Sequence, residues 1–165
     1  MQALHPVHFA AFTRTTPPSP TCDAPVGQAE THAASEHWLQ RSERCNQCSD
    51  APCVGACPTG ASHVGEGGVV LVNAAKCTGC KACMASCPYG ARYVHPAGHV
   101  DKCTFCLHRV ERGQTTACAE VCPTRSLTFG DLSDPESPVA RLLASRRNEV
   151  TKPEAGTKPN VFFLL

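Results

Sequence analysis

The cysteines constrain this chain more than any other feature of its sequence. Thirteen of the 165 residues are cysteine, and twelve of these lie between residues 45 and 122. Large apolar side chains are scarce by comparison, with six Phe, two Tyr and one Trp. Such a chain needs a source of stability besides side-chain burial, and cysteines supply it through disulfides, zinc or iron–sulfur clusters.

The composition argues against disulfides and excludes several classes of protein. The sequence opens without the pattern of a secretion signal, and disulfides persist mainly in oxidising compartments. An odd number of cysteines also cannot pair completely. The formal net charge is +1 with no basic run, so we expect no nucleic-acid partner. Because no run of about 18 apolar residues is present, we expect no membrane-spanning segment.

The most specific motif is C-x2-C-x2-C-x3-C-P, which occupies residues 77–88. In bacterial ferredoxins the first three cysteines of this motif bind one 4Fe-4S cluster, and the fourth ligates the other cluster. Zinc prefers two separate cysteine pairs with a long spacer, whereas the pairs here overlap at Cys80. The spacing therefore favours iron–sulfur chemistry over zinc.

A related motif, C-x2-C-x4-C-x3-C-P, occupies residues 45–58, with two extra residues between its second and third cysteines. If the two motifs exchange their fourth ligands, as in two-cluster ferredoxins, both sites are complete. The first predicted cluster then takes Cys45, Cys48, Cys53 and Cys87. The second predicted cluster takes Cys57, Cys77, Cys80 and Cys83.

A third cysteine group is spaced differently, and its members are Cys103, Cys106, Cys118 and Cys122. A C-x2-C pair and a distant cysteine pair also suit zinc. The ending Cys-Pro-Thr at residues 122–124 repeats that at residues 57–59, which favours a third iron–sulfur site. This group has no partner motif for an exchange, so either Cys122 or Cys22 would complete the site. Otherwise Cys22 is an incidental thiol.

The repeat predicts an α+β fold that resembles a bacterial ferredoxin, with pseudo-symmetric units of short strands and helices around the clusters. Each Cys-Pro ending is followed by a short strand candidate. These strand candidates are residues 62–64 with a return strand at 69–72, residues 92–94 and residues 127–129. We expect the ferredoxin-type domain to span residues 45–130.

The two ends of the chain differ from this central part. Residues 1–44 are proline-rich and predict a loosely ordered arm, with a helix over residues 30–44 as the alternative. Residues 131–165 predict a helix followed by an extended docking tail. Ser137 and Pro138 read as the N-cap and first position of that helix, which runs to about residue 147. The apolar end, residues 161–165, covers either its own domain or a partner subunit.

Residues outside the cysteine motifs offer little chemistry of their own. No nucleophile–base pair, paired carboxylates or phosphate-binding loop is evident, so we expect no catalytic residues and place substrate chemistry in a partner. Three lysines adjoin cysteines and would raise reduction potentials, attract an acidic partner or simply be solvated; they are Lys76, Lys81 and Lys102. The histidines outside the cysteine spacing read as surface residues, namely His63, His95, His99 and His108.

Residues 45–165 closely resemble the iron–sulfur electron-transfer subunits of the dimethyl-sulfoxide-reductase family of molybdenum enzymes. That group includes tetrathionate, polysulfide and thiosulfate reductase subunits. The segments that carry the resemblance are residues 45–53, 87–92, 102–109, 129–132 and 156–161. Family members typically begin with a further C-x2-C-x2-C-x3-C motif, which residues 1–44 lack. The resemblance therefore implies two 4Fe-4S clusters and leaves a third open, rather than four.

The resemblance also implies a role and partners. Such a subunit relays electrons between a quinol-oxidising membrane anchor and a molybdopterin-containing catalytic subunit, and is not itself an enzyme. It would lie at the bacterial inner membrane, on the periplasmic side if a signal-bearing partner carries it across, or in the cytoplasm. Two alternatives remain: a zinc-stapled interaction module without redox activity, and a free-standing soluble ferredoxin.

Overall fold

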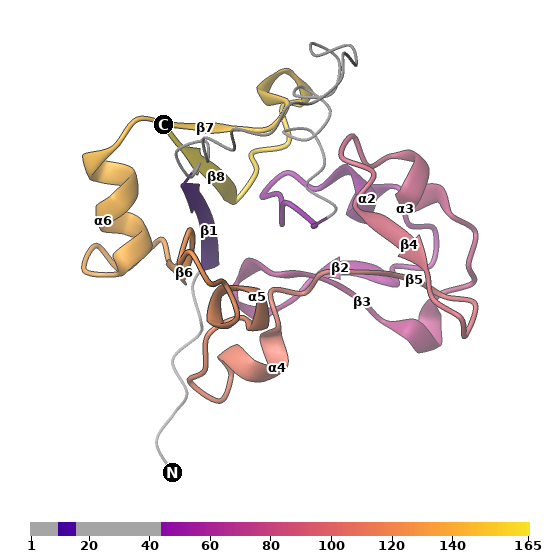
Figure 1. The fold of residues 1–165 in the computed structure, drawn as a ribbon. Helices are drawn as coiled ribbons and strands as arrows, with labels where there is room; N and C mark the ends of the chain where they lie inside the picture. Colours follow the sequence, from indigo (N-terminus) through magenta and orange to yellow (C-terminus); the bar gives the residue numbers. More distant parts are fainter. Residues whose placement is uncertain (1–9, 16–43) are drawn as a thin grey trace, which may run out of the picture.

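The computed structural model describes residues 10–15 and 44–165 of the chain (Figure 1). Cys22 lies outside the described residues, as does the helix predicted over residues 30–44 apart from residue 44 itself. The described elements are short, and the longest helix, α6 (Pro138–Ser145), has eight residues. In the part of the chain that is described, no helix has the length and apolar character to cross a membrane.

Two helix–hairpin units carry the first two cysteine motifs. In the first unit, α2 (Pro52–Gly55) precedes the antiparallel hairpin of β2 (Ser62–Val64) and β3 (Val70–Val72). In the second, α3 (Ala82–Ala85) precedes the antiparallel hairpin of β4 (Arg92–Val94) and β5 (Val100–Lys102). The strands expected at residues 62–64, 69–72 and 92–94 are confirmed. Strand β5 was not predicted, because two of its three residues are charged.

Short 3-10 helices and close turns complete these units. The helix η1 (Glu66–Gly68) lies between β2 and β3, and η2 (Ala74–Lys76) leads into the second motif. Gly79, between the first two cysteines of that motif, has a φ of 71°. A Cβ atom there would lie 2.6 Å from the carbonyl oxygen of Gly98 in the β4–β5 turn. The cysteine loop thus packs directly on the hairpin turn and requires glycine at this position.

The rest of the chain forms a four-stranded sheet in the order β6-β1-β8-β7. The helices α4 (Leu107–Val110) and α5 (Ala117–Glu120) precede β6 (Leu127–Asp131). After α6 come β7 (Asn148–Val150), η3 (Pro153–Ala155) and β8 (Val161–Leu164). Figure 1 shows this sheet and α6 at one end of the molecule and the two hairpins with α2 and α3 toward the other.

Strand β1 (Ala10–Thr15) corrects the expectation of a loosely ordered arm for these six residues. It pairs antiparallel with β6 and parallel with β8, so it is an interior strand of the sheet. The physical reason is that β6 and β8 each present an edge of unpaired backbone groups, and β1 satisfies both edges at once. Sequence patterning alone did not indicate so distant a partner.

The predicted C-terminal helix is confirmed. The Ser137 hydroxyl caps α6 by accepting a hydrogen bond from the Ala140 amide at 3.2 Å, and Pro138 is its first residue. Val139 is fully buried beneath β6, where a Cβ atom on Gly130 would meet its side chain at 3.2 Å. The helix ends at Ser145, two residues before the predicted end, and Arg146 already has extended backbone.

Among the described residues, the apolar core forms two small clusters. One is built on Phe105 and Val161, and the Phe105 ring meets that of Phe129 edge-on with 5.6 Å between ring centroids. The other consists of Cys53, Val70, Cys83 and Val100. Cysteine therefore takes positions that a larger aliphatic residue would fill in most domains.

The C-terminal segment packs in part on its own chain. Val161 and Leu164 are buried. Before them, the backbone amide of Ser49 donates to the Lys158 carbonyl at 2.9 Å, and that of Asp50 donates to the Thr157 carbonyl at 3.1 Å.

Asn160 completes this attachment of the tail to the first cysteine loop. Its backbone amide donates to the Asn46 carbonyl at 2.9 Å, and its side-chain amide donates to the Gln47 carbonyl at 2.5 Å. Residues 157–160 thus lie along residues 46–50, which are more than a hundred positions earlier in the sequence. The first cysteine loop is held in place from outside its own motif.

Replacing Asn160 by Ala is expected to destabilise the protein by about 1–3 kcal/mol, because the buried Gln47 carbonyl loses its donor. For a protein of this size the apparent midpoint of thermal unfolding falls by about 2–4 °C per kcal/mol. The measurement is anaerobic thermal unfolding followed by circular dichroism at a fixed scan rate.

The matched control is Asp50→Ala, which removes an exposed ion pair with Lys158 at 2.7 Å in the same stretch. Such surface pairs contribute about 0–1 kcal/mol, so the midpoint of this variant stays close to wild type. Equal midpoints for Asn160→Ala and Asp50→Ala would contradict the assigned role of Asn160.

Candidate iron–sulfur sites

All twelve cysteines of the three motif groups are free thiols, and they differ in burial. Four of them are buried, namely Cys45, Cys48, Cys53 and Cys83. Cys80 is exposed, and the other seven are partly buried. Buried sulfurs from both of the first two motifs are thus gathered inside the fold rather than displayed on its surface.

The four cysteines assigned to the first predicted cluster line one small cavity, together with Asn46, Val70, Tyr89 and Arg92 among other residues. Three of these cysteines come from the first motif, and Cys87 comes from the second. The thiol of Cys48 interacts electrostatically with those of Cys45, Cys53 and Cys87. The structure therefore brings together the set that the exchange of fourth ligands requires.

Local backbone geometry directs these sulfurs inward. Gln47, within the first C-x2-C loop, has a φ of 46°, and its amide points to the Cys45 sulfur at 3.4 Å. The Gln47 side chain accepts from the Val70 amide at 2.8 Å and donates to the Cys103 carbonyl at 2.7 Å. Pro52 is the first residue of α2, a position where the helix needs no backbone amide donor. The next residue, Cys53, is buried.

The second predicted site is assembled less completely. Cys83 interacts electrostatically with Cys57, which again joins one motif to the fourth cysteine of the other. Cys77 packs beside Cys83 against the core and accepts a hydrogen bond from the Val100 amide at 3.4 Å. Cys80 is the exposed member of this set.

The third cysteine group lies beside the first site. Cys103 interacts electrostatically with Cys106 in its own group and with Cys45 in the first motif. Cys103 and Cys118 pack against the apolar cluster of Phe105 and Val161. Cys122 is placed differently, since its sulfur shares hydrogen bonds with the hydroxyls of Thr124 and Ser126, each at 3.4 Å.

The environments of the thiols shift their pKa values in opposite directions. Burial raises the pKa of Cys48 to about 11, and burial also raises the pKa of Cys45, Cys83 and Cys103. Hydrogen bonds lower the pKa of two thiols that lie nearer the surface. The Ser62 amide lowers the pKa of Cys57 to about 7, and nearby hydroxyls lower the pKa of Cys122 to about 6.

The buried thiols have to lose their protons to bind iron, because the thiolate is the metal ligand. Two buried cations stand close to them. Arg92 donates from Nη2 to the Cys53 sulfur at 3.0 Å and to the Ser62 hydroxyl at 2.7 Å. Lys102 donates from Nζ to the carbonyls of Val70 and Cys103, the latter at 2.9 Å. These charges compensate the negative charge of nearby thiolates.

Unpaired polar atoms test whether an iron–sulfur cluster fits the first cavity. Nε and Nη1 of Arg92 are buried and have no hydrogen-bond partner among the described residues, and the same holds for the Asn46 side-chain amide. Both residues line the cavity. Buried donors without acceptors are rare in native proteins. Thiolate and inorganic sulfide are acceptors, so a 4Fe-4S cluster fits this donor-rich, sulfur-ringed cavity.

Within residues 10–15 and 44–165, no three His, Cys, Asp or Glu side chains stand in an arrangement that would hold one metal ion. The candidate ligands instead surround a space between them. All-thiolate ligation suits iron–sulfur clusters or zinc.

The lysines and histidines noted in the sequence have different environments. Lys102 is buried, so the interpretation that its ammonium group is simply solvated is wrong. Lys76 and Lys81, by contrast, are exposed. The rings of His95 and His99 stack with 4.4 Å between centroids, and His63 shares a hydrogen bond with the Ala61 carbonyl at 3.0 Å. The role of Arg92 was not anticipated from the sequence. Its position in the CPYGAR segment, directly at the start of a predicted strand, was the available signal.

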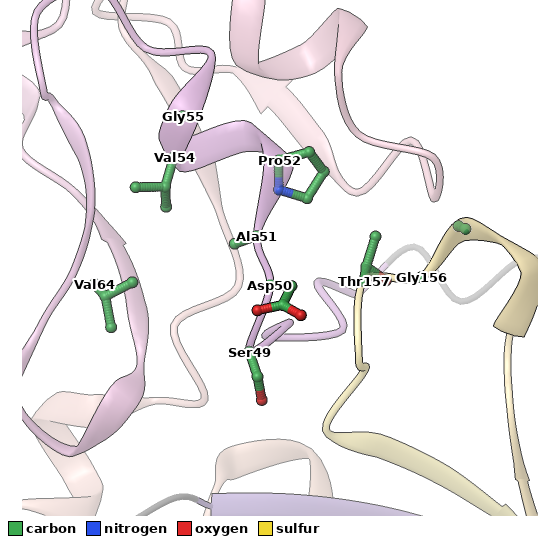
Figure 2. Close-up of a pocket in the computed structure, with 10 residues that line it drawn as sticks. Ser49, Asp50, Ala51, Pro52, Val54, Gly55, Val64, Gly156 and Thr157 are labelled. Carbon is green, nitrogen blue, oxygen red and sulfur yellow. The ribbon is translucent and has the colours of Figure 1, made fainter.

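An open hollow lies next to the first cysteine loop (Figure 2). Its walls come from α2, from Val64 at the end of β2 and from residues 155–157 of the tail. Figure 2 shows Ser49 and Asp50 on the loop, with Pro52 above them and Thr157 to their right. No cysteine lines this hollow, so it is separate from the sulfur-lined cavity.

Comparison with known proteins agrees with this chemistry. Residues 36–132 match the family model of the 4Fe-4S dicluster domain. Over 124 residues, the sequence is 50% identical to one of the chains of polysulfide reductase from Wolinella succinogenes, a match that covers 74% of this chain and 65% of that relative.

Two further relatives are iron–sulfur subunits according to their names. The arsenate respiratory reductase iron-sulfur subunit of a Shewanella species is 34% identical over 169 aligned positions, covering 73% of this chain and 72% of the relative. A putative dimethyl sulfoxide reductase iron-sulfur subunit of Halobacterium salinarum is 38% identical over 138 positions. This match covers 73% of this chain and 53% of the relative. The chain thus spans between about half and three quarters of the length of these relatives.

Proposed function

Because this protein belongs to the 4Fe-4S dicluster family, together with the iron–sulfur subunits of the dimethyl-sulfoxide-reductase family, we propose that it is an electron-transfer subunit of a molybdenum reductase complex. The observation that carries this proposal is the cavity ringed by four cysteines from two motifs, with unpaired donors of Arg92 beside it. A bound 4Fe-4S cluster supplies a one-electron redox centre. The chain itself contributes no catalytic residue.

The proposed ligand sets follow the exchange of fourth cysteines. The first cluster is bound by Cys45, Cys48, Cys53 and Cys87, which share a cavity. The second is bound by Cys57, Cys77, Cys80 and Cys83, with the Cys57–Cys83 interaction as support. A third site uses Cys103, Cys106 and Cys118, with Cys122 as the fourth candidate. The two helix–hairpin units are proposed to be related by pseudo-symmetry, as two-cluster ferredoxins are.

The residues around the first cavity hold and shield the proposed cluster. Thr157 shares a hydrogen bond with the Tyr89 phenol at 2.5 Å, and it counteracts the larger effect of burial on the pKa of Cys48. Thr157 is buried, and its bond to Tyr89, which lines the cavity, connects the tail to this site. Donors to the sulfurs and exclusion of water are two of the means by which a protein sets a cluster potential.

The proposed partners are a molybdopterin-containing catalytic subunit and a quinol-oxidising membrane anchor. The support is that the relatives named above are a chain of polysulfide reductase and the iron-sulfur subunit of an arsenate respiratory reductase. We place the complex at the bacterial inner membrane, on the periplasmic side with a signal-bearing partner. Residues 131–165 are themselves part of the folded domain, because β8 pairs with β7 and with β1.

The cluster content is tested by counting iron and acid-labile sulfide in anaerobically purified protein. Two clusters give about eight irons with equal sulfide, and filling of the third cysteine group gives about twelve. A broad absorbance near 400 nm accompanies either result. Stoichiometric zinc without sulfide would contradict the proposal and support a zinc-stapled module instead.

The exchange of fourth ligands is tested by pairs of serine variants. Cys57→Ser and Cys83→Ser are expected to alter the same electron paramagnetic resonance signal of the reduced protein. Cys87→Ser and Cys48→Ser are expected to alter a different one. If Cys57→Ser instead affects the signal that responds to Cys48→Ser, each motif binds its own cluster and the exchange is wrong.

The place in a complex is tested with the tagged protein expressed in its native host. We expect a molybdenum-containing large subunit to co-purify, and the clusters in that complex to be reduced by a quinol. Isolation of a fully loaded chain without molybdenum or a large partner would favour a free-standing ferredoxin.

A further inference from the structure

Two buried cations face each other across one hairpin. Arg92 at the start of β4 and Lys102 at the end of β5 are directly opposed residues in the antiparallel register. Their exposed fractions are only 6% and 3%. Directly opposed residues in an antiparallel pair project from the same face of the sheet. One position of the hairpin therefore delivers two charges to the interior, on the side of the cysteines.

Arg92 interacts with cysteines of both proposed clusters. Nη2 donates to the sulfur of Cys53, which belongs to the first set. Its charge also acts on Cys83, which belongs to the second set and lies in the same apolar cluster as Cys53. Through the Ser62 hydroxyl it reaches a third cysteine, since the Ser62 amide donates to the Cys57 sulfur at 3.3 Å. Arg92 thus lies at the junction between the two sites.

Lys102 lies at a different junction. Burial lowers the pKa of Lys102, and the charges of Cys45 in the first set and Cys103 in the third group act in the opposite direction. Its ammonium also donates to the Cys103 carbonyl. The first site is therefore flanked by a cation on each side, one shared with the second site and one shared with the third group.

The effect of such a charge on a redox centre has a definite sign. Reduction of a cluster adds one negative charge, and a nearby buried cation stabilises the reduced form more than the oxidised form. The reduction potential therefore rises. An arginine remains protonated in a protein, so its contribution is a fixed charge. A cation between two clusters raises the potentials of both.

We propose that Arg92 sets the reduction potentials of the first and second clusters jointly, and that Lys102 does the same for the first cluster and the third group. This inference rests on the proposed function. Both residues act as positioning and charge-bearing groups beside the ligands and take no part as ligands. Their placement in opposed strand positions lets one hairpin shift the potentials of neighbouring centres in the same direction.

The test is a redox titration of the full-length, cluster-loaded protein followed by electron paramagnetic resonance. Arg92→Gln is expected to lower the midpoint potentials of the first and second clusters and leave the third unchanged. The expected shift is at least tenfold in the reduction equilibrium, which is about 59 mV for one electron. Lys102→Gln is expected to lower the midpoint potentials of the first cluster and of the third group, and to leave the midpoint potential of the second cluster unchanged.

Two further variants separate charge from structure. Arg92→Lys keeps the charge and is expected to restore potentials close to wild type. Arg112→Gln removes an exposed arginine in the turn after α4 and is expected to change none of them. Wild-type iron and sulfide in Arg92→Gln with unchanged potentials would overturn the inference, and equal shifts of every cluster in both glutamine variants would also do so.

A measurement on the wild-type protein covers the case in which Arg92→Gln does not assemble. Protein labelled with ¹⁵N-arginine is reduced and examined by pulsed electron paramagnetic resonance. A hydrogen bond from Arg92 to a cluster ligand predicts a ¹⁵N coupling to the reduced cluster, and its absence would overturn the inference. Failure of the proposed function looks different, since the wild-type protein would then contain no iron or sulfide.

Discussion

Four of the buried apolar side chains at the centre of this protein are cysteines, Cys45, Cys48, Cys53 and Cys83, and each has to give up a proton to bind a cluster. Burial opposes that loss, as the raised pKa of Cys48 shows. The fold compensates with cations and backbone donors brought to the sulfurs: Arg92 to Cys53, the Gln47 amide to Cys45 and the Val100 amide to Cys77. The short helices and hairpins are arranged around this requirement, and the two small apolar clusters are secondary to it.

The β4–β5 hairpin meets much of this requirement in very few residues. Its turn packs against Gly79 in the second motif, its β5 amide donates to a cysteine sulfur, and its first strand pair supplies both buried cations. Because Arg92 and Lys102 are opposed in register, a slip of one residue would move either charge to the other face of the hairpin. The strand register therefore fixes the charges near the cysteines.

The helices and strands that could be predicted from the sequence are those determined by residues next to them in the chain. The strands after each Cys-Pro and the helix capped by Ser137 follow from turn residues and capping chemistry, and the structure contains them. Sequence reasoning did not reach β1, whose partners lie more than a hundred residues away, or β5, whose short charged sequence carries no alternating pattern. It also did not place Arg92 against the sulfurs, because burial of a charge depends on a partner from another motif. Lys102 was noted for its position beside a cysteine, yet only the fold makes it an interior residue.

The attachment of residues 157–160 to the first cysteine loop has a consequence for biosynthesis. The loop at residues 46–50 forms its outer backbone hydrogen bonds with Thr157, Lys158 and Asn160, so these bonds cannot form until residues 157–160 have been synthesised. The second motif and its hairpin are complete by residue 102. The first cysteine loop thus reaches its full set of backbone hydrogen bonds later in synthesis than the second motif does, and a nascent chain that stops before residue 157 would lack them.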